Sequence, residues 1–400
     1  MSNNLTDWDT FEFHVRVDHS RLQSSLIQME AYRLAIQRLT VPPHWAQDLR
    51  RLNIVRAVHG TTAIEGNPLT EEEVQQAIDA QPAPSPINGN AERQVRNAYS
   101  AHEWVQQAFS DREGRAISLD DILHMHLLLT EGSDEADNEP GQLRRGGHDV
   151  TVGSPDLGGV HRGAPGGARL RELISEYVDR LQSPDVSSLN PVERALWAHF
   201  YLVTLHPFGN GNGRTARCVE AALLYQGGYN AHGFFSLSNY FYAEREEYIR
   251  LLQRTRTELR HDLTEFFAFG LGGFIEELER INSYLRRRTE HLMYRELIRQ
   301  CYDRRVGKRR RLLNDRETRL LHHLLDRTPP PSPFTDEPET SVTTRELTAS
   351  QFFRLNYGNV TWRTINREIN RLAQLGFVRY HQIATDDWRI ELDFSAIARY

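Results

Sequence analysis

The chain has 400 residues, of which 39% are hydrophobic and 26% charged, an ordinary balance for a soluble globular protein of two or three domains. Its formal net charge of −6 gives no overall attraction to nucleic acid. Of its 48 basic residues only Lys308 is a lysine, and no P-loop motif surrounds it, which excludes a Walker-type NTPase.

The N-terminal residues, Met1 to Phe11, lack the basic segment and apolar stretch of a signal peptide, so we expect a cytoplasmic protein. Cys218 and Cys301 lie too far apart in sequence for a CxxC-type zinc site. A disulfide between them is not expected in the cytoplasm.

Helices are predicted for the first part of the chain. Apolar residues spaced by three and four predict one from residue 15 onward, at Leu22, Leu26, Met29, Tyr32 and Ile36. Pro42-Pro43 interrupts it before a second helix, Trp45 to Ile64, which ends at Gly66-Asn67-Pro68. Thr70 and Glu73 form a capping box that starts the next helix.

Residues 141–167 contain nine glycines, and this composition predicts a break in the helical pattern. Two short alternating stretches, His148 to Val152 and Gly159 to His161, flank a turn and predict a β-hairpin. Helices are expected to resume at 168–181, 191–205 and 213–225, the second of them with Pro191 at its first position.

The last third of the chain shows a different pattern. Residues 286–319 hold 13 basic and 5 acidic residues, which indicates a solvated helical face or connector, or a nucleic-acid patch. A Pro-rich acidic linker follows at 329–340. Helices at 343–352 and 360–375 and strands at 377–382 and 388–392 then predict a winged helix-turn-helix, with 313–325 as its first helix.

The chemistry is concentrated in the segment HPFGNGNGRTAR, residues 206–217. A histidine ends one helix, three glycines permit a tight turn, and the next helix begins at once with its positive end at the turn. Arg214 and Arg217 lie three apart on that helix and share a face. Together these residues predict an anion-binding site for a polyphosphate, with His206 beside it as a base.

This segment resembles the signature of the Fic (filamentation-induced-by-cAMP) family, HPFx[D/E]GNGRxxR, and departs from it only at Asn210. The resemblance extends over about residues 45–275. It implies a mainly α fold, with an N-terminal helical region at 1–110 that carries an inhibitory helix. The Fic-type core would cover 111–285, with the hairpin as a target-positioning flap, followed by a basic connector at 286–328 and a winged-helix module at 329–400.

The resemblance also implies an activity, the transfer of AMP from ATP to a Ser, Thr or Tyr hydroxyl of a target protein with release of pyrophosphate. His206 would deprotonate the hydroxyl. Gly211, Asn212 and Gly213 would cradle the α- and β-phosphates, while Arg214 would neutralise the β-phosphate and Arg217 would hold the γ-phosphate. Phe208 would pack into the core and fix the turn.

Asn210 stands where the family has the carboxylate that holds Mg²⁺ between the phosphates. An amide oxygen can ligate a metal but brings no charge. We therefore expect Asn210 to be a metal ligand, with an effect on Mg²⁺ affinity or on the balance between transfer and removal of AMP.

A second motif, TTAIEGN at 61–67, closes the second helix. Thr61 and Glu65 lie four apart and share a face, and a carboxylate at a helix C-terminus favours a nearby cation. The segment is similar to the family's inhibitory motif, [S/T]xxxE[G/N]. That resemblance implies that Glu65 pairs with Arg217 in place of the γ-phosphate, either within one chain or between subunits of a homodimer.

Three classes of function fit these patterns. They are a regulated protein adenylyltransferase, which could also modify itself; a hydrolase that removes AMP, or a transferase of another phosphate-linked group; and a nucleotide-sensing winged-helix regulator. Arg363, Arg367 and Arg371 could contact phosphates of DNA, and protein docking is an equal alternative for that module. His148, His161 and His199 are expected to be satisfied or solvated.

Overall fold

The computed structural model describes residues 6–39, 41–80, 89–110, 115–135, 137–230, 233, 236–306, 310–328, 341–358, 360–385 and 387–400. The chain divides into two compact units, residues 1–279 and 280–400. Both are mainly helical, as the sequence predicts. Within the described residues, no helix is both long and apolar enough to cross a membrane.

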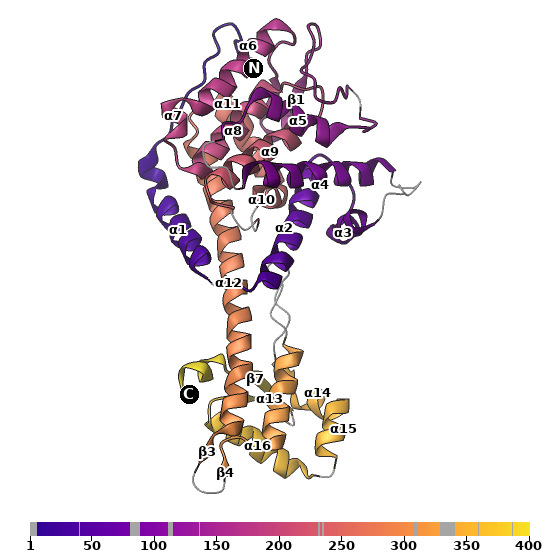
Figure 1. Cartoon of the computed structure of the whole chain (residues 1–400), viewed down its shortest axis with the longest axis vertical. Helices are drawn as coiled ribbons and strands as arrows, with labels where there is room; N and C mark the ends of the chain where they lie inside the picture. The colour runs from indigo at the N-terminus through magenta and orange to yellow at the C-terminus, as the bar shows by residue number, and fades with distance from the viewer. Residues whose placement is uncertain are drawn as a thin grey trace. The chain divides into compact units, whose positions relative to one another are not determined.

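The N-terminal unit is a helical array with one small hairpin (Figure 1). Its helices are α1 (His19–Arg38), α2 (Pro43–Ala63), α3 (Glu71–Asp79), α4 (Gly89–Phe109), α5 (Leu119–Thr130), α6 (Ala168–Gln182), α7 (Pro184–Ser187), α8 (Pro191–Leu205), α9 (Asn212–Gln226), α10 (Leu237–Ala243), α11 (Arg245–Thr257) and the first part of α12 (Thr264–Asp303). The hairpin consists of β1 (Thr151–Ser154) and β2 (Gly159–Arg162), paired antiparallel, with Thr151 opposite Arg162. The predicted hairpin is thus confirmed, but its first strand begins three residues later, at Thr151.

Helices α8 and α9 form the centre of this unit, with α4, α5 and α6 packed around them (Figure 1). Both are buried along almost their whole length: α8 is largely apolar, whereas α9 also buries polar and charged residues, among them Arg214, Arg217 and Glu220. Pro191 takes the first position of α8, as predicted, and Asn190 caps it through a reciprocal box with Glu193. The predicted capping box of Thr70 and Glu73 is likewise present at α3.

The 40-residue helix α12 begins in the N-terminal unit and ends in the C-terminal one. Its early glycines allow other helices to come close. A Cβ at Gly270 would lie 2.4 Å from the Leu196 side chain of α8, and one at Gly273 would lie 2.2 Å from the Tyr240 ring. Gly270 and Gly273 are therefore packing residues.

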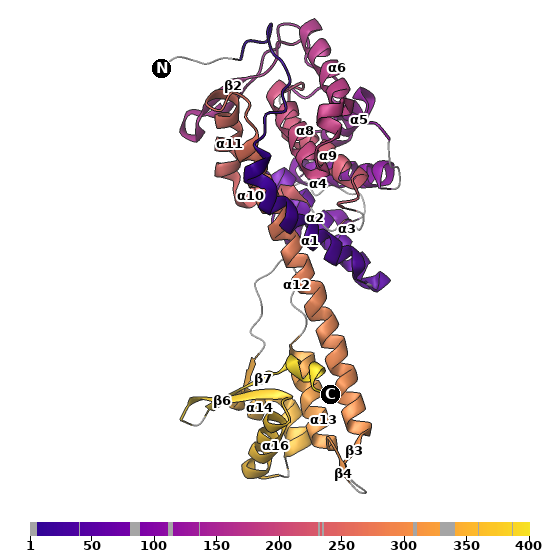
Figure 2. The same ribbon diagram turned by 90° about the vertical axis from the view of Figure 1, so that its left-hand side faces the viewer.

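The C-terminal unit has the element order of a winged helix (Figure 2). After the end of α12 come β3 (Arg305–Val306), β4 (Arg310–Arg311), α13 (Asp315–Arg327), β5 (Ser341–Thr343), α14 (Thr344–Ala349), α15 (Gln351–Tyr357), α16 (Trp362–Gln374), β6 (Val378–Ala384) and β7 (Asp387–Leu392). The sheet is antiparallel in the order β5-β7-β6. The predicted linker at 329–340 lies outside the described residues.

Two boundaries in this region differ from the sequence analysis. The helix predicted at 343–352 is divided into α14 and α15, because Ser350 has an extended backbone and its Oγ accepts a hydrogen bond from the Phe353 N–H. The division between units lies at Glu279–Arg280 instead of 285/286. The predicted first helix of the winged helix, 313–325, corresponds to α13, whose Leu320, Leu321 and Leu324 are buried in the core of this unit. Residues of the expected connector, Tyr294, Leu297 and Ile298 of α12, share the same core.

Candidate active site

The turn between α8 and α9 is built by its own side chains and backbone. His206 ends α8 in the left-handed region (φ +53°), and its N–H donates to the Leu202 carbonyl. Asn212 is buried and closes the turn, because its Oδ1 accepts from the Phe208 N–H (2.9 Å) and its Nδ2 donates to the Phe208 carbonyl (2.8 Å). Gly211 has φ +74° and is the N-cap residue of α9, whose first turn no side chain caps within the described residues. The free N–H groups of this turn can therefore meet an anion.

Phe208 is fully buried, as expected, and stacks on His126 of α5 at a ring distance of 3.7 Å. The Gly141 N–H donates to His126 Nδ1 (2.9 Å), which leaves the proton of the neutral ring on Nε2. That Nε2 donates to the Asn210 carbonyl (3.0 Å). His126 of α5 therefore holds the turn in place through Phe208 and Asn210. The sequence analysis did not identify this residue.

One ring nitrogen of His206 is left able to accept a proton. Its Nδ1 lies 3.3 Å from the Val203 carbonyl, and because a carbonyl only accepts, Nδ1 carries the proton and Nε2 keeps its lone pair. Burial lowers the pKa of His206 to about 4, with further lowering by the charges of Arg256 and Arg144, although the Val203 contact opposes it. The imidazole is therefore neutral at pH 7 and able to accept a proton.

Arg144 holds this turn against the base of the hairpin and was not found from the sequence. It is 2% exposed and donates to three carbonyls, those of His206 (2.9 Å), His148 (2.7 Å) and Ala164 (2.6 Å). Arg144 thus ties the turn after α8 to both ends of the hairpin segment. The pattern Arg144-Arg145-Gly146-Gly147 was the only signal that could have indicated it.

Arg217 of α9 contacts the end of α2. Its Nε donates to Thr61 Oγ1 (2.7 Å), and its terminal nitrogen donates to the Thr61 carbonyl (3.0 Å) and to Glu65 Oε1 (2.7 Å). The contact forms within a single chain. Burial by itself would raise the pKa of Glu65, but the charges of Arg217 and Arg214 outweigh it and the pKa is lowered. Glu65 is therefore ionised and paired with the guanidinium of Arg217.

Glu65 also stands over the start of α9. A Cβ at Gly213 would lie 2.4 Å from Glu65 Oε1, so only glycine permits this approach. From the other side Arg245 of α11 donates through Nε to the Ile64 carbonyl (3.1 Å) and secures the end of the segment. Arg245 was missed by the sequence analysis, because its contact joins residues 181 positions apart.

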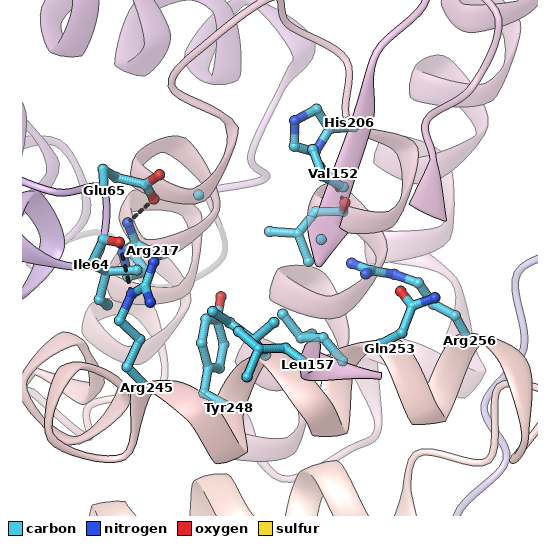
Figure 3. A pocket seen from close by; sticks show the side chains of 15 residues that line it. Ile64, Glu65, Val152, Leu157, His206, Arg217, Arg245, Tyr248, Gln253 and Arg256 are labelled. Atoms are coloured by element: carbon cyan, nitrogen blue, oxygen red, sulfur yellow. Dashed lines mark hydrogen bonds and ion pairs between the residues drawn. The ribbon is translucent and has the colours of Figure 1, made fainter. Parts of the chain in front are cut away.

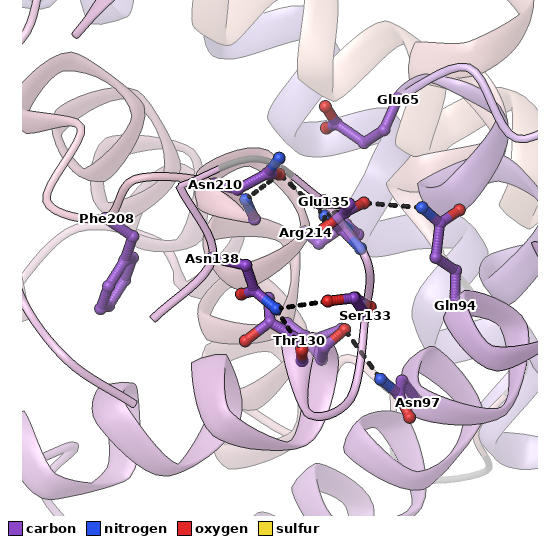
Figure 4. A network of polar contacts seen from close by, with 12 residues as sticks. Glu65, Gln94, Asn97, Thr130, Ser133, Glu135, Asn138, Phe208, Asn210 and Arg214 are labelled. Atoms are coloured by element: carbon purple, nitrogen blue, oxygen red, sulfur yellow. Dashed lines mark hydrogen bonds and ion pairs between the residues drawn. The ribbon is translucent and has the colours of Figure 1, made fainter. Parts of the chain in front are cut away.

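Arg214 faces a different group from Arg217. It is 1% exposed, and its terminal nitrogen donates to both oxygens of Glu135 (2.8 and 2.7 Å) and to Asn210 Oδ1 (3.0 Å) (Figure 4). Its Nε and second terminal nitrogen are buried without a hydrogen-bond partner in the part of the chain that is described. Glu135 is a further residue that the sequence analysis missed, although it belongs to the acidic loop at 131–139.

A cavity of about 310 Å³ lies between the hairpin, α9 and α11 (Figure 3). His206 lies on one side, and Glu65, Arg217 and Arg245 lie on the other. Its remaining lining is largely apolar or aromatic and comprises Ile64, Val152, Leu157, Val203, Tyr248, Ile249 and Leu252, with Gly153, Gly213, Gln253 and Arg256. An apolar chamber with a base and a cation at opposite sides suits a nucleotide.

The predicted site residues divide into three groups. His206, Gly213, Arg217 and Glu65 line the cavity, and Thr61 binds Arg217. Gly211 and Asn212 build the turn, whereas Asn210 and Arg214 face Glu135. The other histidines have structural contacts, as expected: His199 binds Glu220 and Tyr248, His161 binds the Thr204 carbonyl, and His148 lies 3.6 Å from Asp137.

Known proteins resemble this chain in sequence and in fold. Residues 116–224 match the model of the Fic/DOC family. "Protein adenylyltransferase fic-1" of Caenorhabditis elegans is 30% identical over 177 residues, which are 43% of this chain and 32% of that protein. "Protein adenylyltransferase Fic" of Drosophila willistoni is 28% identical over 213 residues, 53% of this chain and 39% of that protein. The chain thus covers about a third of the length of these relatives.

Two solved structures share the fold. A Fic family protein from Desulfovibrio desulfuricans has a TM-score of 0.54 at 20% identity and covers 96% of this chain, with 98% of its own length matched. A Fic domain containing signaling protein from Bacteroides thetaiotaomicron has a TM-score of 0.53 at 15% identity, over 66% of this chain and 97% of its own. At these identities the likeness concerns the fold alone.

Proposed function

Because residues 116–224 form a Fic/DOC family domain, we propose that this chain is an autoinhibited protein adenylyltransferase, which transfers AMP from ATP to a Ser, Thr or Tyr hydroxyl of a target protein. The observation that carries the proposal is the cavity in which the free Nε2 of His206 stands opposite Arg217. The names of the curated relatives support the same chemistry.

The proposed reaction uses the site as follows. ATP binds with its phosphates at the first turn of α9, where the free N–H groups and the helix dipole favour negative charge. Nε2 of His206 accepts the proton of the target hydroxyl, while the hydroxyl oxygen forms a bond to the α-phosphorus. The bond from the α-phosphorus to the bridging oxygen breaks, and pyrophosphate leaves with its charge neutralised by Arg214. Positioning and electrostatics provide most of the rate in such transfers.

A divalent cation would accompany the nucleotide and neutralise phosphate charge. Across the described residues no group of three or more His, Cys, Asp or Glu side chains could hold a metal ion alone. The oxygen groups that contact Arg214 are the Asn210 amide oxygen, which also accepts from the Gly211 N–H, and the Glu135 carboxylate. Mg²⁺ sites at nucleotides use one or two carboxylates with the phosphates, so the carboxylate fits such a cation.

Autoinhibition follows from the occupancy of Arg217. Glu65 holds the guanidinium that would bind the γ-phosphate, and Thr61 takes two more of its donors. ATP could then enter only with its γ-phosphate displaced, so that the α-phosphorus would not face His206. Because the contact is intramolecular in this chain, we propose inhibition in cis.

The pH dependence of the reaction tests the assignment of the base. We expect kcat/KM for ATP, measured in an activated Glu65→Gly variant with Mg²⁺ present, to stay level from pH 8 to about 5.5. The reason is that the pKa of His206 is lowered to about 4, so the base form is lost only as the pH falls toward that value. A histidine of ordinary pKa would be half protonated at about pH 6.5. A midpoint near 6.5 would contradict the burial-driven shift.

The C-terminal unit favours a second function, the binding of a polyanion such as DNA. Residues 280–400 hold 23 basic and 15 acidic residues, a net charge of +8 in a chain whose total is −6. Arg363 and Arg367 are exposed on one face of α16. Arg371, which the spacing placed with them, instead donates to the buried Glu317 and to the Leu312 carbonyl.

We therefore expect a full-length Arg363→Gln/Arg367→Gln variant to bind duplex DNA about tenfold or more weakly and to show a smaller salt dependence, because two phosphate contacts are lost. Fluorescence anisotropy at several salt concentrations measures both the affinity for DNA and its salt dependence. Arg286→Gln/Arg327→Gln is the matched control, since it removes two exposed charges from α12 and α13 of the same unit. Equal effects of the two pairs would reject α16 as the contact surface.

A further inference from the structure

A carboxylate stands beside Asn210 although the signature segment has none. Glu135 belongs to the loop that follows α5, and its side chain is 13% exposed. Both of its oxygens accept from Arg214, and Gln94 Nε2 donates to its Oε1 (2.6 Å) (Figure 4). Fold topology therefore brings a negative charge to Arg214, in the first turn of α9, from 75 residues upstream of Asn210.

Glu135 and Asn210 converge on one point. The same Arg214 nitrogen lies 2.7 Å from a Glu135 oxygen and 3.0 Å from Asn210 Oδ1. Asn210 Oδ1 also accepts from the Gly211 N–H (2.6 Å), so both of its lone pairs are in use. Beside Arg214, Glu135 can therefore offer a negatively charged oxygen as a ligand, whereas Asn210 cannot.

The loop that carries Glu135 is held in place. Asn138 Nδ2 donates to the Thr130 (2.7 Å) and Ser133 (3.1 Å) carbonyls, and Asn97 of α4 donates to the Glu131 carbonyl (2.9 Å). These contacts fix the backbone before Glu135 and join it to Asn138 after it. The position of Glu135 is therefore set by the folding of the loop.

We propose that Glu135 supplies the carboxylate for the divalent cation of the bound nucleotide, in the role for which Asn210 lacks the charge. This inference rests on the proposed function. Without nucleotide, Glu135 neutralises Arg214. When a triphosphate enters, its β-phosphate takes over the guanidinium, whose other donors are already buried and unpartnered among the described residues. The carboxylate is then free to ligate the cation, directly or through water.

The experiment measures the binding of a non-hydrolysable ATP analogue, AMPPNP, by calorimetry in the Glu65→Gly background, first in EDTA and then over a range of Mg²⁺ concentrations. Glu135→Gln should bind AMPPNP more tightly than its parent in EDTA, because a negative charge is gone from Arg214. The Mg²⁺ concentration that this variant needs for half-maximal AMPPNP binding should nevertheless rise about tenfold or more, which is the usual effect of losing a residue that supports a metal ion. The two effects have opposite signs.

Rescue and control variants separate a ligand from a nearby charge. Glu135→Gln/Asn210→Asp should regain the Mg²⁺ dependence of the parent, because it returns a carboxylate to the signature position. Glu131→Gln, which removes an exposed charge from the same loop, should leave the Mg²⁺ dependence unchanged. Agreement of all three variants with these expectations supports the inference.

Two results would overturn it. Tighter binding by Glu135→Gln both in EDTA and with Mg²⁺ would mean that Glu135 only competes with phosphate for Arg214. An unchanged Mg²⁺ dependence in Glu135→Gln, with normal Mg²⁺-coupled binding in the parent, would reject the cation role while leaving the proposed function intact. Absence of AMPPNP binding in the Glu65→Gly parent itself would reject both.

Discussion

The Glu65→Gly variant should transfer AMP about 10- to 150-fold faster than the unaltered chain. A charge-assisted hydrogen bond of the kind between Glu65 and Arg217 is worth about 1.5–3 kcal/mol, and each 1.4 kcal/mol is a factor of about ten. Removing the carboxylate returns the terminal nitrogen of Arg217 to the γ-phosphate, while Thr61 still orients the guanidinium through Nε. The measurement is the transfer of label from α-³²P-ATP to protein at matched ATP and Mg²⁺.

Charge and size of the side chain can be separated in the same assay. Glu65→Gln should activate less than Glu65→Gly, because an amide oxygen still accepts from Arg217 but lacks the charge. Glu72→Gln, at an exposed glutamate of α3, is the control for a change of net charge. If Glu65→Gly is no more active than the unaltered chain, the contact with Arg217 is structural and the proposal of autoinhibition fails.

A stability measurement gives an independent test of the same contact. Arg217 is 2% exposed, and a buried charge that loses its partner destabilises a protein. Glu65→Gly should therefore unfold at a lower temperature than the unaltered chain when no nucleotide is present. Added ATP should stabilise it more, because tighter binding to the folded state raises the apparent stability.

The sequence was most informative where a local pattern determines a local structure. The helices on both sides of His206, the hairpin at 151–162 and the cap of α3 are set by periodicity, glycine content and capping residues, all of which act over a few positions. The pairing of Glu65 with Arg217 was expected from the family resemblance, and the structure places the two side chains 2.7 Å apart.

The parts that the sequence could not predict depend on contacts between distant segments. Nothing in the spacing around Glu135 indicates that it meets Arg214, which lies 79 residues later. Arg371 continues the four-residue spacing of Arg363 and Arg367, yet tertiary packing brings it to the buried Glu317. In each case a charged side chain that is isolated in sequence gains its partner only when helices pack.

The His206→Ala change in the Glu65→Gly background should lower AMP transfer by about 10²- to 10⁴-fold, the usual contribution of a general base. AMPPNP binding should be retained, because the proposed mechanism assigns the phosphates to the first turn of α9 and not to His206. His148→Ala is the matched control, since His148 lies at the base of the same flap and contacts Asp137. Nearly unchanged transfer by His206→Ala would assign the proton transfer to another group and refute the mechanism, whereas lost transfer with intact binding identifies the base.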